Sequence, residues 1–320
     1  MNERGLRYDI VTSNVTTFVA LLVAVLMWVA SGMTELSETA GGLAATIIVA
    51  YILLELNNRN ALLRIRSRLI SSVFLLLTGG LTFYHDFSSG YIPMICWAAA
   101  YFVFFMCYQN YNSQGYIFHV FLFLSLGAMI FPKMLLLGPF LLFSTIVQMR
   151  AFTLKVFAAA LLGTVFPLAL REAYLIMYRQ NTALYDFWAE LTTFSQPDYS
   201  VLDEHRLVSF AVVAVMAVAA AIHFARTKFN DKIRTRMLYY VFLIEELAIL
   251  ALLVACPDGF DVLFRLFVLN STPLIAHHLA FAGGKAGNIY FYFTALLVLL
   301  LAVYNITGID LGIWEILRSF

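Results

Sequence analysis

The sequence predicts an all-α fold, a polytopic bundle of about eleven transmembrane helices, several of them shorter than the roughly 20 residues that a full crossing needs. Of the 320 residues, 62% are hydrophobic and only 12% are charged, whereas soluble domains carry about 25% charged residues. This polar surface is too small to cover a water-soluble globule, so lipid must surround much of the chain. The basic residues also concentrate in alternate connecting segments, as in chains that cross a bilayer repeatedly.

Apolar runs define the predicted spans, and no soluble domain interrupts them, so residues 1–320 are expected to form a single integral membrane domain. The first run is interpreted as a retained span, because Ala30-Ser31-Gly32 is a poor signal-peptide cleavage site. Two short runs within 116–149 are joined by Pro132-Lys133-Met134, so this part would cross incompletely if it is a helical hairpin. The predicted spans are 15–33, 42–57, 69–84, 93–109, 116–131, 135–149, 156–177, 207–225, 237–255, 262–281 and 289–306.

Charge sorting predicts the orientation of the chain. Basic residues gather in the N-terminal tail and in the segments Arg59–Arg68, Arg150–Lys155 and Arg226–Arg236, while the intervening segments carry few. The positive-inside rule therefore places the N-terminus in the cytoplasm and the tail from Gly308 outside. Arg64, Arg66 and Arg68 are expected to contact anionic lipid headgroups; the alternative is a phosphate-bearing substrate on the cytoplasmic side.

One long outward connection, 178–206, contains an apolar helical face. Leu184, Phe187, Trp188 and Leu191 recur at helical spacing, which predicts an amphipathic helix over 182–194. Such a helix would lie flat at the membrane interface, with Trp188 as its anchor. The alternative is a lid over a cavity that opens outward.

Ionisable residues within predicted spans are the candidate site, because a charge at mid-bilayer costs about 2.5–3.5 kcal/mol. Glu172 and Glu246 are the candidate catalytic residues, each as a general base. Arg171 and Arg265 would hold a pyrophosphate, and His277 and His278 are weaker candidates for substrate binding. The competing interpretation is an interhelical ion pair, Arg171 or Arg265 with Glu246 or Glu172, that only fixes the bundle.

Helix geometry limits these roles. Adjacent residues on a helix point about 100° apart, so Glu245 and Glu246 cannot share one partner, and one of them would pack as a protonated acid. For the same reason His277 and His278 are not by themselves a metal site. Pro273, shortly before the histidines, predicts a kinked or broken helix.

Several classes of function are excluded. The net charge is +1 and no basic stripe with interleaved aromatics occurs, so no nucleic-acid partner is expected. Cys96, Cys107 and Cys256 form no paired motif, and no metal or cofactor is expected. No phosphate-binding loop, dinucleotide fingerprint or hydrolase motif is present, which argues against ATP-driven transport by this chain alone.

Two stretches of the chain together resemble a known family. One is Leu56-Asn57-Asn58-Arg59-Asn60 before the basic run, and the other is Gln148–Lys155 continuing into Leu161–Pro167. The arrangement resembles a family of polytopic inner-membrane proteins from Bacteroidetes whose function is not established. The resemblance covers most of the chain and implies multi-pass insertion in a bacterial inner membrane. It implies no catalytic residues.

Three functions are consistent with these features. The first is a glycosyltransferase or polymerase of cell-envelope glycan assembly, which acts on polyprenyl-phosphate-linked sugars at the outer face. The second is a transporter or lipid flippase in which Glu245 or Glu246 carries a proton and the helix with Pro273 moves. The third is a non-enzymatic envelope scaffold. Membrane lipids are expected as partners in all three cases, and the chain does not indicate any protein partner.

Overall fold

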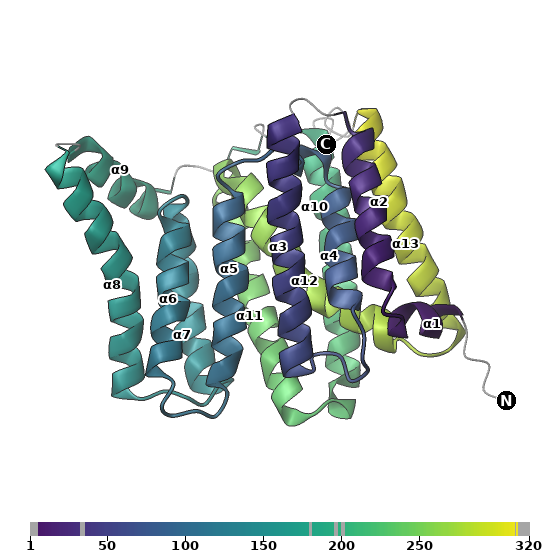
Figure 1. The fold of residues 1–320 in the computed structure, drawn as a ribbon, viewed down its shortest axis with the longest axis horizontal. Coiled ribbons are helices and arrows are strands. Elements are labelled where there is room, and N and C mark those ends of the chain that lie inside the picture. Colours follow the sequence, from purple (N-terminus) through teal and green to yellow (C-terminus); the bar gives the residue numbers. More distant parts are fainter. Residues whose placement is uncertain are drawn as a thin grey trace. The chain divides into compact units, whose positions relative to one another are not determined.

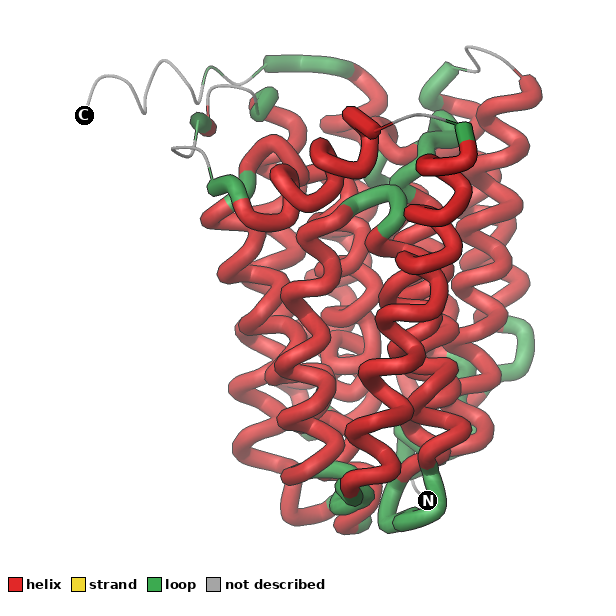
Figure 2. Tube along the Cα trace, turned by 90° about the vertical axis from the view of Figure 1, so that its left-hand side faces the viewer, coloured by secondary structure: helices red, strands yellow, loops and turns green. Residues whose placement is uncertain are grey.

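The described chain is helical throughout, as Figures 1 and 2 show for this computed structural model. The structure describes residues 6–32, 36–178, 181–194, 198–199, 202–310 and 312, and no strand occurs among them. The α-helices are α1 (Leu6–Thr12), α2 (Thr16–Ala30), α3 (Leu36–Asn60), α4 (Leu69–Gly79), α5 (Tyr91–Phe104), α6 (Gln114–Ala128), α7 (Gly138–Val147), α8 (Leu154–Met177), α9 (Asn181–Thr192), α10 (Glu204–Thr227), α11 (Ile233–Ala255), α12 (Phe260–Phe281) and α13 (Gly284–Thr307). Short 3-10 turns connect several of them, namely η1 (Thr82–Tyr84), η2 (Phe105–Cys107), η3 (Pro132–Leu137), η5 (Lys228–Asn230) and η6 (Pro257–Gly259).

Six of the described helices are long and apolar enough to cross a membrane by length and composition: α3, α8, α10, α11, α12 and α13. These helices confirm an all-α, membrane-type fold. The other five predicted spans coincide with shorter apolar segments of 10–17 residues. The count of eleven crossings and the orientation of the chain therefore stay predictions.

The helix that contains Pro273 was expected to be kinked or broken at that proline. α12 runs without interruption from Phe260 to Phe281, with Pro273 inside it, so the prediction of a broken helix is wrong. α8 likewise continues through Pro167. Each proline removes one intrahelical hydrogen bond, yet both helices continue through it.

The chain divides into two compact units, each built from segments far apart in sequence. Unit 1 comprises 1–88, 199–231 and 268–320, and unit 2 comprises 89–198 and 232–267. In unit 1, α2 packs beside α4 and both contact α13. In unit 2, α6 packs between α5 and α8. The expectation of one membrane domain over 1–320 stays a prediction.

A buried amide holds three helices of unit 1 together. Asn305 on α13 donates from Nδ2 to the carbonyl of Gly80 at 2.8 Å and to the hydroxyl of Ser209 on α10 at 3.1 Å. The same helix end is fixed by the Tyr304 hydroxyl, which donates to Glu204 at 2.9 Å. In an apolar environment these hydrogen bonds set the register of α13 against α4 and α10, because an unpaired amide there would be costly.

The predicted amphipathic helix is confirmed as α9, which extends over Asn181–Thr192 and crosses the end of α8 (Figure 1). Phe187 is buried and Trp188 is exposed, in keeping with an apolar face that packs on the protein and an aromatic anchor beside it. Whether the helix also serves as a lid stays a prediction.

His85 closes the end of α4 in unit 1. Its ring stacks on Trp28 with centroids 4.2 Å apart, and Nδ1 lies 2.7 Å from the Ser31 hydroxyl. Nε2 lies 3.1 Å from the carbonyl of Gly79. Because a carbonyl only accepts, Nε2 carries the proton, and Nδ1 of the neutral ring is an acceptor that competes with the Trp28 carbonyl, 2.8 Å from the same hydroxyl, for the single Ser31 proton. Burial lowers the pKa of His85 from 6.5 to about 4, although the Gly79 carbonyl and Asp86 oppose the shift.

Acidification is expected to weaken unit 1 through this histidine. Above pH 6.5 the ring is neutral in both the folded and the unfolded chain. As the pH falls from 6.5 to about 4, the unfolded chain binds the proton first and stability is lost. At pH 5 the loss is about 2 kcal/mol, from 1.36 kcal/mol per pKa unit. The unfolding midpoint of a His85→Phe variant in detergent should fall less between pH 7 and pH 5 than that of the wild type. Equal slopes would show that His85 is not responsible.

Candidate functional site

Arg171 and Glu172, predicted to act together with groups on other spans, pair with each other on α8. Nη1 of Arg171 lies 2.8 Å from Oε1 of Glu172, so this ion pair is within one helix, not between helices as expected. The guanidinium also lies 4.6 Å from the centroid of the Phe187 ring. The pair therefore sits where α9 packs on α8.

Arg265 and Glu246 are both buried in unit 2. The Arg265 guanidinium lies 4.7 Å from the centroid of the Tyr91 ring, and Nη1 lies 3.4 Å from the carbonyl of Asp261. A Cβ on Gly90 would come within 2.7 Å of Nη1, so that glycine makes room for the arginine. Glu246 lies on α11. Neither residue, nor Arg171 or Glu172, lines either of the two cavities described below.

His277 takes part in a buried ionic cluster that the sequence analysis did not predict. Its Nε2 lies 3.0 Å from Oδ2 of Asp231, and both side chains are 0% exposed. Nε of Arg64 lies 2.9 Å from the other oxygen, Oδ1. The carboxylate thus has a cation on one oxygen and an imidazole N–H on the other. Arg64 binds this internal anion, whereas the sequence analysis expected it to contact lipid headgroups.

The segment that carries Arg64 is shaped by the motif Leu56–Asn60. α3 ends with Ala61 in the left-handed region, at φ +49°. Asn57 then spans the loop, since its Nδ2 donates to the Ser67 carbonyl at 2.7 Å and its Oδ1 accepts from the Leu63 N–H at 3.1 Å. Asn57 therefore fixes the loop that directs Arg64 toward Asp231.

His278 belongs to a stack of rings rather than to the ionic cluster. Its ring stacks on His223 of α10, with centroids 4.3 Å apart, and on Tyr290 of α13, with centroids 3.9 Å apart. The His223 ring also lies 6.0 Å, centroid to centroid, from that of His277, so it contacts both histidines of α12. Among the described residues no group of three or more His, Cys, Asp or Glu side chains could hold a metal ion.

Sequence reasoning did not single out Asp231 or His223. Asp231 is the one acid within the basic segment Arg226–Arg236, and an isolated acid in a basic loop was the available signal. His223 contacts His277 and His278 on α12, more than 50 residues away in the chain, so the sequence could not indicate the stack.

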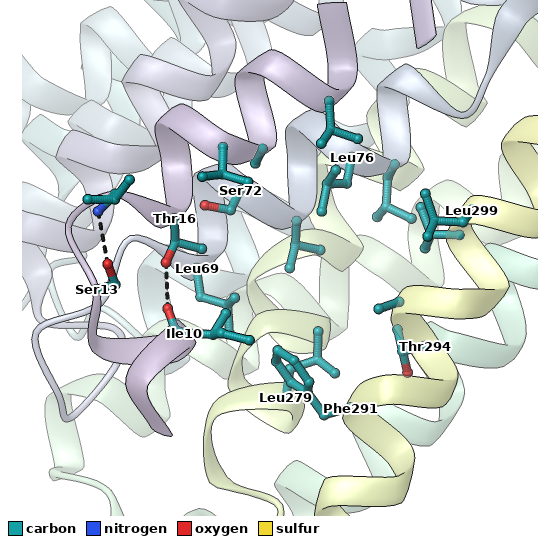
Figure 3. Close-up of a pocket in the computed structure, with 18 of the residues that line it drawn as sticks. Ile10, Ser13, Thr16, Leu69, Ser72, Leu76, Leu279, Phe291, Thr294 and Leu299 are labelled. Carbon is teal, nitrogen blue, oxygen red and sulfur yellow. Dashed lines mark hydrogen bonds between the residues drawn. The ribbon is translucent and has the colours of Figure 1, made fainter. Parts of the chain in front are cut away.

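The larger cavity of unit 1 is apolar and has a volume of about 630 Å³. Figure 3 shows its walls, which come from α1, α2, α4 and α13 with single residues of α10 and α12. Side chains drawn there include Ile10, Ser13, Thr16, Leu69, Ser72, Leu76, Leu279, Phe291, Thr294 and Leu299. Most of its few polar groups lie near the turn between α1 and α2, where the Thr16 hydroxyl donates to the carbonyl of Ile10, and Thr294 lies apart from them on α13.

This cavity opens on the apolar outer surface of the helices. Val19 on α2 and Leu299 on α13 both line it, yet they are 55% and 47% exposed. Their neighbours Leu22 and Leu296 are also exposed. On a membrane-type helix, an exposed apolar face is the face that contacts lipid. The opening between α2 and α13 is therefore lateral, toward the lipid chains.

A second, polar cavity of about 380 Å³ lies on the other side of α1. Arg7 lines it and donates from Nη1 to Asn288 and from Nη2 to the carbonyl of Ala280, each at 3.2 Å. Partial burial lowers the pKa of Arg7, and nearby Tyr292 opposes that shift. A guanidinium remains charged in proteins, so this cavity contains a fixed cation.

α1 separates an apolar cavity from a polar one, although the sequence analysis treated its residues as part of a polar tail. Asp9, Ile10 and Ser13 line the apolar cavity, and Arg7, Tyr8 and Val11 line the polar one. A guanidinium from the next loop also reaches this turn, because Nη1 of Arg68 lies 3.3 Å from the carbonyl of Asn14. The arrangement suits a molecule with a long apolar chain and an anionic head.

The fold and these cavities define a helical membrane protein with a cavity that opens sideways to lipid. No protein-family model, curated protein or solved structure matches the chain. The resemblance to the Bacteroidetes inner-membrane proteins therefore stays a prediction.

Proposed function

We propose that this protein binds a long-chain lipid phosphate, with the chain in the apolar cavity and the head group extending around α1 toward Arg7, which lines the neighbouring polar cavity. A polyprenyl-phosphate-linked sugar in a bacterial inner membrane is the ligand class we favour, as expected for an enzyme of envelope glycan assembly. The observation that carries the proposal is the 630 Å³ cavity between α1, α2, α4 and α13. Its volume lies within the range of about 300–1,000 Å³ typical of ligand sites.

The walls of the cavity favour an isoprenoid or acyl chain over a polar ligand. Apolar side chains form almost all of the surface, and the opening at Val19 and Leu299 faces the lipid side. A chain could enter sideways from the bilayer without crossing water. Three of the four lining hydroxyl groups, from Ser13, Thr16 and Ser72, lie at one end, where a head group would begin.

The head group is expected to be anionic. Arg68 reaches the turn after α1, beside the hydroxyl groups, and Arg7 lies at the opposite end of this short helix in the polar cavity. Guanidinium groups bind phosphate oxygens in bidentate geometry. This proposal differs from the expected site at Arg171, Arg265, Glu172 and Glu246. It moves lipid recognition to the end of unit 1 that carries the N-terminus, which the positive-inside rule assigns to the cytoplasm.

A lipid cavity supports an enzyme or a flippase more than a scaffold. A scaffold has no need for a cavity larger than a few hundred Å³. Transport is the second candidate, and the buried carboxyl of Glu245 on α11 favours it specifically.

Val19→Trp and Leu299→Trp are expected to weaken lipid binding by about tenfold or more, equivalent to about 1.4 kcal/mol, because an indole at the opening blocks the chain. Binding of undecaprenyl phosphate to the detergent-solubilised protein can be followed by native mass spectrometry. Leu26→Trp is the matched control, because Leu26 is 58% exposed on the same helix but does not line the cavity.

The variant Arg7→Gln tests recognition of the head group separately from recognition of the chain. This variant should weaken binding of undecaprenyl phosphate but leave binding of uncharged undecaprenol unchanged. If the wild type and the two blocked variants bind undecaprenyl phosphate equally, the apolar cavity is not the lipid site and the proposal fails.

A further inference from the structure

We infer that Glu245 is a proton-binding site within the membrane-spanning part of unit 2, occupied by a proton in the packed state. The inference is independent of the lipid site proposed for unit 1. Glu245 lies at the middle of α11, a 23-residue helix long and apolar enough to cross a membrane. Its side chain is 0% exposed, and neither carboxyl oxygen has a hydrogen-bond partner among the described residues.

Among the described residues, no cation lies within hydrogen-bond distance of either carboxyl oxygen of Glu245, and the buried Arg265 of the same unit lies against the ring of Tyr91. α7, which packs on α11, contains no ionisable residue over Gly138–Val147. η3 also packs there and carries Lys133, but Nζ of that lysine lies 5.3 Å from the centroid of the Phe194 ring. η6 contributes only the exposed Asp258.

The remaining ionisable neighbours are phenolic or acidic. Tyr101 on α5 is fully buried and electrostatically close to both Glu245 and Glu246. Its ring packs against Phe242, one turn before Glu245, with centroids 5.0 Å apart. A tyrosine hydroxyl and a second carboxyl provide no positive charge. The last basic residue at the start of α11 is Arg236. It lies about 13 Å from Glu245 along the helix, at 1.5 Å per residue.

An ionised carboxylate that is fully buried, with no cation and no hydrogen-bond partner among the described residues, is too costly to persist in such an environment. The carboxyl group is therefore protonated and neutral in this packing. Release of the proton requires water or a cation to reach Glu245, and this happens only if the helices around it separate. Occupancy by the proton is thus linked to helix packing, the linkage that a proton-coupled conformational change uses.

Dicyclohexylcarbodiimide tests the site directly, because this apolar reagent enters membranes and reacts with protonated carboxyl groups. The acid adds across one C=N bond of the carbodiimide. Its oxygen bonds to carbon, its proton passes to nitrogen, and rearrangement leaves a stable N-acylurea with no leaving group. We expect mass spectrometry of the labelled full-length protein to place one added reagent on Glu245.

Glu245→Gln should abolish this label, whereas the matched variant Glu246→Gln should retain it. Because glutamine mimics the neutral acid, Glu245→Gln is expected to unfold at the same temperature as the wild type or higher. An infrared band of a protonated carboxylic acid should disappear in Glu245→Gln and persist in Glu246→Gln.

Two results would overturn the inference. One is a carbodiimide label that persists unchanged in Glu245→Gln. The other is an infrared spectrum in which Glu245→Gln removes a carboxylate band and leaves every carboxylic-acid band in place. The infrared measurement requires no reagent access, so it decides the protonation state even if the carbodiimide does not reach α11.

Discussion

Replacing Arg64 by methionine is expected to destabilise the protein by about 3 kcal/mol, the lower end of the range for breaking a buried ion pair. Arg64 supplies the cation beside Oδ1 of Asp231, and that carboxylate is 0% exposed. Without Arg64 its remaining described partner is the imidazole of His277. The lower end applies because the Arg64 side chain is itself 34% exposed. The unfolding midpoint in a denaturing-detergent titration measures the loss.

Arg66→Met is the matched control for this prediction, because Arg66 lies in the same loop and is exposed. Adding Asp231→Asn to Arg64→Met should recover part of the loss, since the amide removes the uncompensated charge and can still accept from His277. This double-mutant comparison isolates the charge from the packing of the methionine. Equal midpoints for Arg64→Met and Arg66→Met would show that the ion pair contributes nothing to stability.

Gly163→Val is expected to destabilise unit 2 by about 3 kcal/mol, at the upper end of the usual cost of overpacking. A Cβ at Gly163 on α8 would lie 2.4 Å from the carbonyl oxygen of Phe118 on α6. That oxygen belongs to the backbone, so α6 and α8 must move apart. The separation also strains the hydrogen bond from the Ser125 hydroxyl to the carbonyl of Thr164, which is 2.6 Å long. Small residues commonly permit such close helix contacts in membranes.

Gly115→Val is the control for the helix-contact prediction. Gly115 also lies in a helix, yet a Cβ added to it would meet no other atom within 4 Å. An exposed substitution of this kind usually changes stability by less than about 0.5 kcal/mol. Unfolding midpoints of both variants, measured in the same detergent, separate the loss of contact from the general effect of removing a glycine. Similar midpoints for the two would refute tight packing at Gly163.

The residues of the two motifs that carry the family resemblance have structural roles that were not evident from the sequence. Asn57 holds the loop 61–68 through hydrogen bonds to two backbone groups. In the second motif, the Met149 carbonyl accepts from the Gln109 N–H at 2.7 Å, and Arg150 adopts a positive φ of +51°. Gly163 then provides the contact with α6. Such patterns mark backbone and packing requirements, which explains why they indicated no catalytic chemistry.

The candidate site was only partly predictable for a physical reason. An ionisable residue inside an apolar run is easily recognised in a sequence. The candidates found in this way were Arg171, Glu172, Glu245, Glu246, Arg265 and His277. Their partners come from distant segments, and local periodicity carries no information on those pairings. Asp231 and Arg64 lie in connecting segments, where charge is unremarkable. The cavity depends on how α1, α2, α4 and α13 pack, and its lining residues look like any other apolar helix residues.

The apolar runs alone are enough to predict a helical chain of membrane type and to place almost every helix. Hydrophobic runs decide this locally, because a backbone in lipid must satisfy its own hydrogen bonds within each helix. Three-dimensional packing, in contrast, brings Arg64, Asp231 and His277 into one cluster, leaves Glu245 without a hydrogen-bond partner among the described residues, and places α1 between two cavities. These features depend on side-chain contacts between segments separated by many residues, and helical periodicity constrains which face of a helix is apolar but not which helix covers it.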